Sequence, residues 1–226
     1  WLELTAQSRK ADFTFKDNGE LVHELWVLDD EASISKIKNE LDARSHVYIA
    51  DGHHRTEAFA QTYISSGKSE IYRHFLTAYF SLDNLDIHAY HRMISQEPML
   101  SDAFKTILSL KSVLEIRPML SYPSHERLEM EGPGMYLFYN DQWMQLTWRE
   151  EIIKEHTGET KLDAELLNEF VLKRIFDCKD IRRDNRIKYL DSTKGTEHLV
   201  NKVLKEASIA FLIPRISKSQ FCDLLD

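Results

Sequence analysis

Five consecutive residues, 51–55, carry side chains that suit the binding or transfer of a phosphate group. Gly52 lacks a Cβ, so a phosphate can approach the backbone closely there. His53 and His54 can donate N–H hydrogen bonds to phosphate oxygens, and the Arg55 guanidinium can chelate two of them. Asp51 can accept a proton from an attacking hydroxyl or hold a metal-bound nucleotide. We therefore predict a phosphate or nucleotide site here, with Asp51 and His54 as the candidate catalytic residues.

The neighbouring sequence predicts elements that would place these side chains at one spot. Residues 47–50 form a short apolar run typical of a buried strand, and residues 54–66 are typical of a helix. Free backbone N–H groups and the positive end of the dipole converge at a helix start. A strand, a glycine turn and a helix start form a common anion site. The alternative interpretation is an ordinary helix cap with polar surface histidines.

A second group of candidate residues lies on a predicted strand at residues 87–94. Because side chains alternate along a strand, His88, Tyr90 and Arg92 share one face while His91 lies on the other. The functional hypothesis is that His91 or Arg92 reaches the same phosphate as residues 51–55. An ordinary edge-strand pattern is the alternative. His23, on an early strand, is a weaker third candidate.

A metal site is the rival interpretation of the same side chains. Asp51, His53 and His54, together with His88 or His91, are residue types that bind zinc or iron. Adjacent histidines rarely ligate one ion, however, because their side chains diverge. Phosphate binding is therefore the preferred hypothesis.

One further stretch resembles a phosphate-binding motif but lacks the spacing that the motif requires. Residues 66–69 read Ser-Gly-Lys-Ser, like the end of a P-loop, but that loop needs a glycine five residues before Gly67. Position 62 is Thr62, and the preceding stretch is predicted to be helical. A locally basic run at residues 179–188 is interleaved with acids, which favours a salt-bridged surface over contact with nucleic acid.

Composition limits the classes of function. The chain has 226 residues, of which 42% are hydrophobic and 29% charged, as in a globular protein. Its net charge of −8 argues against general affinity for nucleic acid. No apolar run approaches the ~18 residues of a membrane span. Cys178 and Cys222 form no metal-binding pattern, which fits a cytoplasmic protein. The chain opens on Trp1, and we expect it to be a piece of a longer protein.

Alternating strands and helices predict an α+β (mixed α/β) fold with mixed sheets. Predicted strands cover residues 13–15, 21–28, 47–50, 75–82, 87–94, 113–116, 135–139, 143–148, 187–190 and 209–213. Predicted helices cover residues 30–41, 54–66, 101–110, 163–175, 196–206 and 217–225. Two hairpins are expected, with positive φ angles in the turn Asp17-Asn18-Gly19 and a second turn at Asn140-Asp141. Ser101 is the expected N-cap of its helix.

Prolines and glycines between residues 118 and 134 mark the best candidate for a domain boundary. We predict one region at residues 1–117, which holds the 51–55 segment, and a C-terminal α/β region at residues 118–226.

Several stretches together resemble the family named domain of unknown function 1015. Its members carry labels such as SpoOJ/ParA/ParB/RepB-like protein or helix-turn-helix transcription regulator. The resemblance spans nearly the whole chain, and its most specific part is residues 48–55. Glu24 and Thr56 depart from the family pattern, which has a basic residue and an aromatic residue there. The other resembling stretches are residues 23–26, 91–92, 188–190 and 210–213.

The string Asp-Gly-His-His-Arg is also similar to the phosphate-binding loop of the ParB/sulfiredoxin superfamily. That resemblance implies a ParB/sulfiredoxin-like core in residues 1–117, with Gly52 to Arg55 on nucleotide phosphates and Asp51 as acid, base or metal partner. It implies ATP or ADP with Mg²⁺ as cofactor and phosphoryl transfer to a small molecule. The sulfiredoxin cysteine has no counterpart here. A DNA-associated regulator and a structural scaffold stay open as alternatives, as does whether the chain is an enzyme.

Overall fold

The strands form two antiparallel sheets in the computed structural model, which describes residues 1–95, 101–120, 133–156, 162–206 and 208–224. The chain divides into two units, Trp1–Phe75 and Leu76–Asp226, and each sheet belongs to one of them. The predicted α+β class is confirmed. The predicted mixed sheets are not, because the strand pairs of both sheets are antiparallel.

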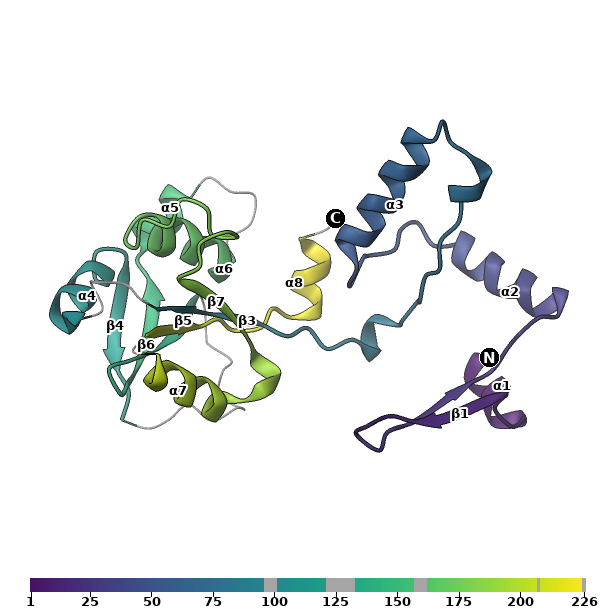
Figure 1. The fold of residues 1–226 in the computed structure, drawn as a ribbon, viewed down its shortest axis with the longest axis horizontal. Helices are drawn as coiled ribbons and strands as arrows, with labels where there is room; N and C mark the ends of the chain where they lie inside the picture. The colour runs from purple at the N-terminus through teal and green to yellow at the C-terminus, as the bar shows by residue number, and fades with distance from the viewer. Residues whose placement is uncertain (96–100, 121–132, 157–161, 207, 225–226) are drawn as a thin grey trace. The chain divides into compact units, whose positions relative to one another are not determined.

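The first unit consists of short, separate elements (Figure 1). They are α1 (Leu2–Ser8), β1 (Phe13–Lys16), β2 (Val22–Leu25), α2 (Glu31–Asp42), α3 (His53–Ser65) and the 3₁₀ turn η1 (Glu70–Tyr72). The β1–β2 hairpin confirms the predicted pairing. Its positive φ falls on Glu20, at 64°, and not in the predicted Asp-Asn-Gly turn. The reason is that the Asp17 carboxylate accepts hydrogen bonds from the N–H groups of Gly19 and Leu21.

No residue of the first unit is buried, and all of its residues are described. This explains why residues 47–50 do not form the predicted strand. A buried strand needs a neighbouring strand and a covering layer, whereas Val47 and Ile49 are exposed and β1 pairs with β2.

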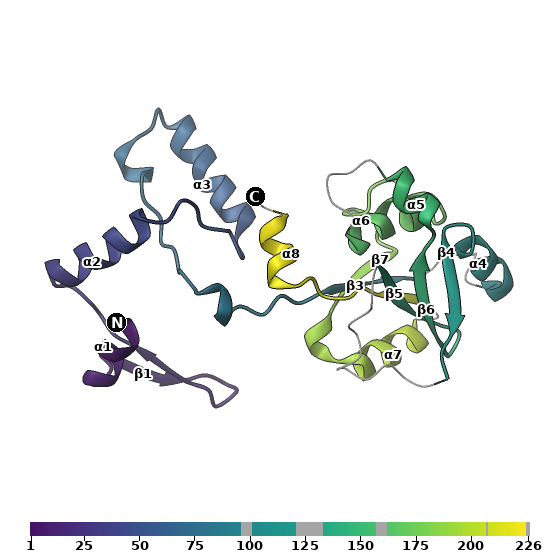
Figure 2. The ribbon, with the colours of Figure 1, turned by 180° about the vertical axis from the view of Figure 1, so that it is seen from behind.

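The second unit contains the hydrophobic core. It also contains most of the strands (Figure 2). Its strands are β3 (Tyr90–Ile94), β4 (Leu114–Pro118), β5 (Gly134–Tyr139), β6 (Gln142–Trp148), β7 (Ile187–Asp191) and β8 (Ile209–Leu212). Its helices are η2 (Leu82–Asn84), α4 (Ala103–Leu110), α5 (Glu150–Glu155), α6 (Asp163–Leu166), the π-helix η5 (Leu167–Lys173), η6 (Ser192–Lys194), α7 (Thr196–Lys205) and α8 (Lys218–Asp223).

The six strands follow the order β4-β6-β5-β8-β3-β7. The β5–β6 hairpin turns at Asn140 and Asp141, whose φ angles of 51° and 58° are those of the predicted tight turn. The last described strand of the chain, β8, lies in the middle of the sheet and pairs with both β5 and β3, whereas β7 lies at an edge.

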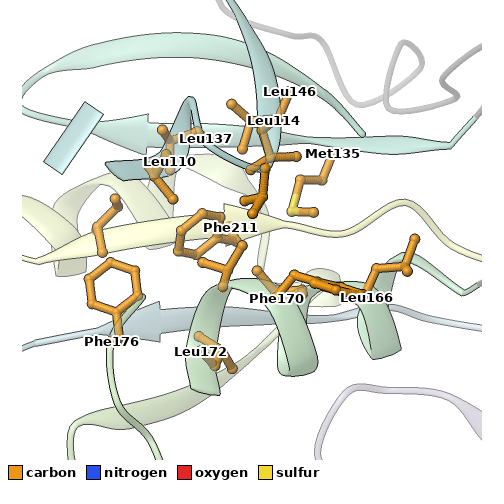
Figure 3. Close-up of a cluster of buried hydrophobic side chains, with 14 of the residues drawn as sticks. Leu110, Leu114, Met135, Leu137, Leu146, Leu166, Phe170, Leu172, Phe176 and Phe211 are labelled. Atoms are coloured by element: carbon orange, nitrogen blue, oxygen red, sulfur yellow. The ribbon is translucent and has the colours of Figure 1, made fainter. Parts of the chain in front are cut away.

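Both faces of this sheet are covered by helices. One face packs against α5, α6 and η5, and the other packs against α7 (Figures 1 and 2). Figure 3 shows Phe211 of β8 on the face that packs against α5, α6 and η5, with Leu137 on one side and Phe170 of η5 on the other. The rings of Phe176 and Phe211 meet edge to face, with centroids 6.4 Å apart. The core thus fixes the positions of β3 and β8, the strands next to the candidate residues of this unit.

Three further predictions need correction in the second unit. Residues 75–82 form no strand before η2 begins at Leu82, and Leu76 is 99% exposed, so no layer covers this stretch. The predicted strand at 87–94 is limited to β3. The N-cap of α4 is Asp102 and not Ser101, because the carboxylate of Asp102 accepts a hydrogen bond from the Lys105 N–H at 3.0 Å.

The predicted domain boundary at residues 117 and 118 differs from the division that the structure shows after Phe75. β4 ends at Pro118 and pairs with β6, so the strand on that boundary belongs to the large sheet. Most of the proline- and glycine-rich passage, residues 121–132, and the predicted end of the last helix at residue 225 lie outside the described residues.

Candidate functional site

Gly52 sets the backbone conformation at the predicted phosphate site. It is the N-cap of α3, with φ 82° and ψ 22°, in the left-handed region that favours glycine. Its carbonyl accepts the first helical hydrogen bond, from the Thr56 N–H at 2.9 Å. The glycine therefore lets the chain turn sharply into α3.

The Arg55 guanidinium folds back over this glycine. A Cβ built on Gly52 would lie 3.3 Å from Nη2 of Arg55, 3.5 Å from Nε and 3.6 Å from Cζ. Nη2 also donates a hydrogen bond to Oδ2 of Asp51 at 3.1 Å. The side chains of Arg55 and Asp51 are 82% and 93% exposed, so the ion pair is a weak, solvated one that an anion can displace.

The start of α3 has the donors expected of an anion site. The first N–H groups of a helix have no intrahelical acceptor, and Gly52 has no side chain that could accept from them. The positive end of the helix dipole and the Arg55 guanidinium lie at the same end of the helix. His53 and His54, in the first turn, are exposed. The arrangement can therefore bind an anion at the surface.

The geometry does not favour the metal interpretation. Within the described residues there is no group of three or more His, Cys, Asp or Glu side chains that could hold a metal ion. Asp51, His53 and His54 thus do not come together as a ligand set. His23 pairs with Asp17 at 3.2 Å and stacks on Phe15, which accounts for it as a hairpin residue.

His91 and Arg92, the second group of candidates, lie on opposite faces of the sheet, as the alternation of side chains along a strand predicts. His91 is buried, with 5% of its surface exposed, and lies on the same face as Met93. Arg92 lies on the opposite face, with its guanidinium 4.2 Å from the centre of the Tyr189 ring. Its Nη1 donates to the Tyr90 carbonyl, and burial lowers the pKa of this arginine. Of these two residues, Arg92 lines a cavity of the described part of the chain, and His91 is not in that lining.

That cavity has a volume of about 690 Å³ and lies within the second unit. Its walls come from the chain leading into β3, the start of α6, and the connection from β8 into α8. Its polar lining residues are His88, Tyr90, Arg92, Asp163, Arg215, Ser217 and Gln220. The last four are not among the predicted site residues. No sequence motif marks these four residues. The order of the strands in the sheet brings their segments together at the cavity.

Asp163 is the cavity residue with the most perturbed ionisation. Burial raises its pKa to about 6, although hydrogen bonds from the Trp148 side chain and the Gly134 backbone lower it. Trp148 Nε1 donates to Oδ1 of Asp163 at 2.7 Å. The carboxyl group therefore titrates near neutral pH.

The basic run at residues 179–188 is a salt-bridged surface, as predicted. Arg186 pairs with Asp184 at 2.6 Å and holds the pKa of that carboxyl down at about 2, and Arg183 pairs with Asp180. Lys188 pairs with Glu206 of the segment after α7.

The predicted site residues thus lie in two separately described units. Residues 51–55 come together at the start of α3, and Arg92 lines the cavity of the second unit. That Arg92 or His91 binds the same ligand as residues 51–55 stays a prediction.

Comparison with known protein families places the chain. The model of a family described as "protein of unknown function (DUF1015)" matches residues 1–175. Searches of curated proteins and of solved structures found no significant match. None of the helices in the described part of the chain combines the length and apolar character needed to cross a membrane. Since the family model covers well over half of the 226 residues, the chain belongs to the DUF1015 family.

Proposed function

We propose that this DUF1015 protein binds the phosphate groups of a nucleotide at the start of α3. ATP or ADP with Mg²⁺ is the expected ligand, and phosphoryl transfer to a small molecule is the expected reaction. The similarity of residues 51–55 to the ParB/sulfiredoxin phosphate loop supports this proposal, and the local geometry supports it independently.

The observation that carries the proposal is the position of Arg55 over a left-handed Gly52. A glycine N-cap leaves the first N–H groups of the helix open to a ligand, and the guanidinium lies beside them. Both kinds of donor favour phosphate oxygens, and a bidentate guanidinium adds geometric specificity.

The proposed binding step is an exchange of partners at Arg55. A phosphate oxygen replaces Oδ2 of Asp51, and the released carboxylate becomes available to Mg²⁺ or to a substrate hydroxyl. This exchange costs little because the ion pair between Asp51 and Arg55 is solvent-exposed.

The proposed reaction follows from the same residues. The hydroxyl oxygen of the acceptor attacks the terminal phosphorus of ATP, its proton passes to Asp51, and ADP leaves with the electrons of the broken P–O bond. His54 in the first turn of α3 donates to the phosphate oxygens as their charge changes.

Calorimetric titration of the whole chain with ATP and ADP, with and without Mg²⁺, tests the binding. Arg55→Ala should weaken the affinity at least tenfold, since it removes a charge-assisted phosphate contact. Arg73→Ala is the matched control, because Arg73 forms a similar exposed pair with Glu70 in the same unit. Absence of binding by the unmodified chain, or equal losses in the two variants, would contradict the proposal.

A further inference from the structure

The cavity of the second unit is a separate candidate binding site. At about 690 Å³ it has the size of a small-molecule pocket. Most of its lining is apolar, with Ile87, Leu162 and Ile213 among the wall residues. The charged side chains in its lining include Arg92 from β3, Asp163 from α6 and Arg215 from the connection before α8. The combination is that of a pocket for a mainly apolar ligand with a charged end.

Arg92 is already held in place for such a ligand. Its guanidinium lies over the Tyr189 ring, and its Nη1 donates to the Tyr90 carbonyl. Its Nε is buried and has no hydrogen-bond partner within the described ranges, where no carboxylate forms an ion pair with it either. A half-buried cation without an ion-pair partner is unfavourable, so Arg92 favours an anion. The Asp163 carboxyl group in the same lining is balanced by a second cation, Arg215.

The shape and charge of the lining indicate which class of anion the pocket binds. A guanidinium pairs with a carboxylate through two parallel hydrogen bonds, and one fixed arginine matches one negative charge. A phosphate dianion would add a second negative charge to a pocket whose lining already contains the carboxyl group of Asp163. We propose that the pocket binds a small organic carboxylate, with its oxygens on Arg92 and its hydrocarbon body against the apolar walls.

One hydrogen bond joins distant segments of the second unit next to the pocket. Lys218 Nζ donates to the Asp83 carbonyl at 2.8 Å, which joins the start of α8 to η2. Ser217 and Gln220, both in the lining, form a capping box at the start of α8. These contacts restrain the start of α8, which directly follows the segment that carries Arg215.

Calorimetry on the whole chain with hexanoate and phenylacetate as probes tests the proposal. The amides hexanamide and phenylacetamide are the neutral controls. Phenyl phosphate is the control for a second anion class, and it is tested on the Arg55→Ala chain so that the site proposed at the start of α3 does not contribute. We expect saturable binding of the carboxylates, at least tenfold tighter than that of the amides and tighter than that of phenyl phosphate. Absence of saturable carboxylate binding, equal amide binding or tighter phosphate binding would overturn the proposal.

Three variants locate the binding. Arg92→Gln should weaken carboxylate binding at least tenfold, and Arg215→Gln, at an exposed wall position, should weaken it less. Arg174→Gln is the matched control, because Arg174 also lies over an aromatic ring, that of Phe170, but does not line the pocket. It should bind as the unmodified chain does. Circular dichroism checks that each variant is folded.

Two results at the variants would contradict the proposal. The first is unchanged carboxylate affinity in a folded Arg92→Gln chain. If that variant does not fold, unchanged affinity in Arg215→Gln takes its place, because Arg215 is exposed and its loss is compatible with folding. Arg55→Ala should leave carboxylate binding intact, so failure of the phosphate proposal and failure of this one are distinguishable.

Discussion

The guanidinium of Arg55 lies close against the place where a side chain on Gly52 would begin, with Nη2 3.3 Å from the position of an ideal Cβ. The glycine therefore has two roles. Its φ of 82° turns the chain into α3, and its missing side chain leaves room for the arginine at the helix start.

Gly52→Ala should weaken nucleotide binding about tenfold, because the new methyl group crowds the Arg55 guanidinium and strains a left-handed residue. Gly67→Ala is the matched control. Gly67 lies beyond the other end of α3 with a φ of 70°, and its Cβ would meet nothing within 4 Å. Both variants carry similar backbone strain, so calorimetric titration with ATP separates strain from the loss of the site. Similar losses of affinity in the two would argue that strain alone is responsible.

Asp51→Asn should strengthen metal-free binding of inorganic phosphate about two- to fivefold, because the carboxylate that competes for Arg55 is removed. The same change should abolish phosphoryl transfer from ATP, since the proposed proton acceptor is lost. Glu70→Gln, at the corresponding acid of the Arg73 pair, should alter neither property. Phosphate titration and an ADP-release assay measure the two effects. Weaker phosphate binding by the Asp51 variant would contradict the exchange of partners.

The stability of the second unit should fall as pH rises from about 4 to about 7. The pKa of Asp163 is about 6 in the folded chain against 3.8 in the unfolded chain, so the folded state binds more protons in this window. The stabilisation is complete below pH 3.8 and is lost as pH rises through 6. The two pKa values imply a change of about 3 kcal/mol.

Asp163→Asn removes this titration and keeps an oxygen for the Trp148 N–H. Urea unfolding at several pH values should show the decline in the unmodified chain and a smaller one in the variant. Parallel pH profiles for the two chains would show that Asp163 is not the titrating group.

Phe211→Ala should destabilise the second unit by about 3–5 kcal/mol, because Phe211 is fully buried and packs edge to face against Phe176. Phe104→Ala serves as the control, since Phe104 is 76% exposed and should change stability by less than about 0.5 kcal/mol. Urea unfolding followed by near-ultraviolet circular dichroism measures both. A small effect at Phe211 would mean that the core is not packed around β8.

Local signals predict much of the second unit. The turn at Asn140 and Asp141 has the side chains that tolerate positive φ, and the hairpin forms around it. The last helix begins where Ser217 can cap it. Such signals lie within a few residues of one another, so no knowledge of the rest of the fold is needed.

Predictions that depend on distant residues are less successful. The apolar run at residues 47–50 resembles a buried strand, but its unit supplies neither a partner strand nor a covering layer. The cavity joins Arg92, Asp163 and Arg215, which meet only because β8 pairs with β3 and α6 covers the same face. No spacing in the sequence connects these three residues.

The most direct test of phosphate binding at α3 follows the backbone amide resonances of the whole chain during titration with ATP. The account predicts that the amides of His53, His54 and Arg55 shift together and saturate with one dissociation constant, while those of Arg73 and Gly67 stay in place. Saturating shifts elsewhere in the chain with unchanged resonances at residues 53–55 would contradict it.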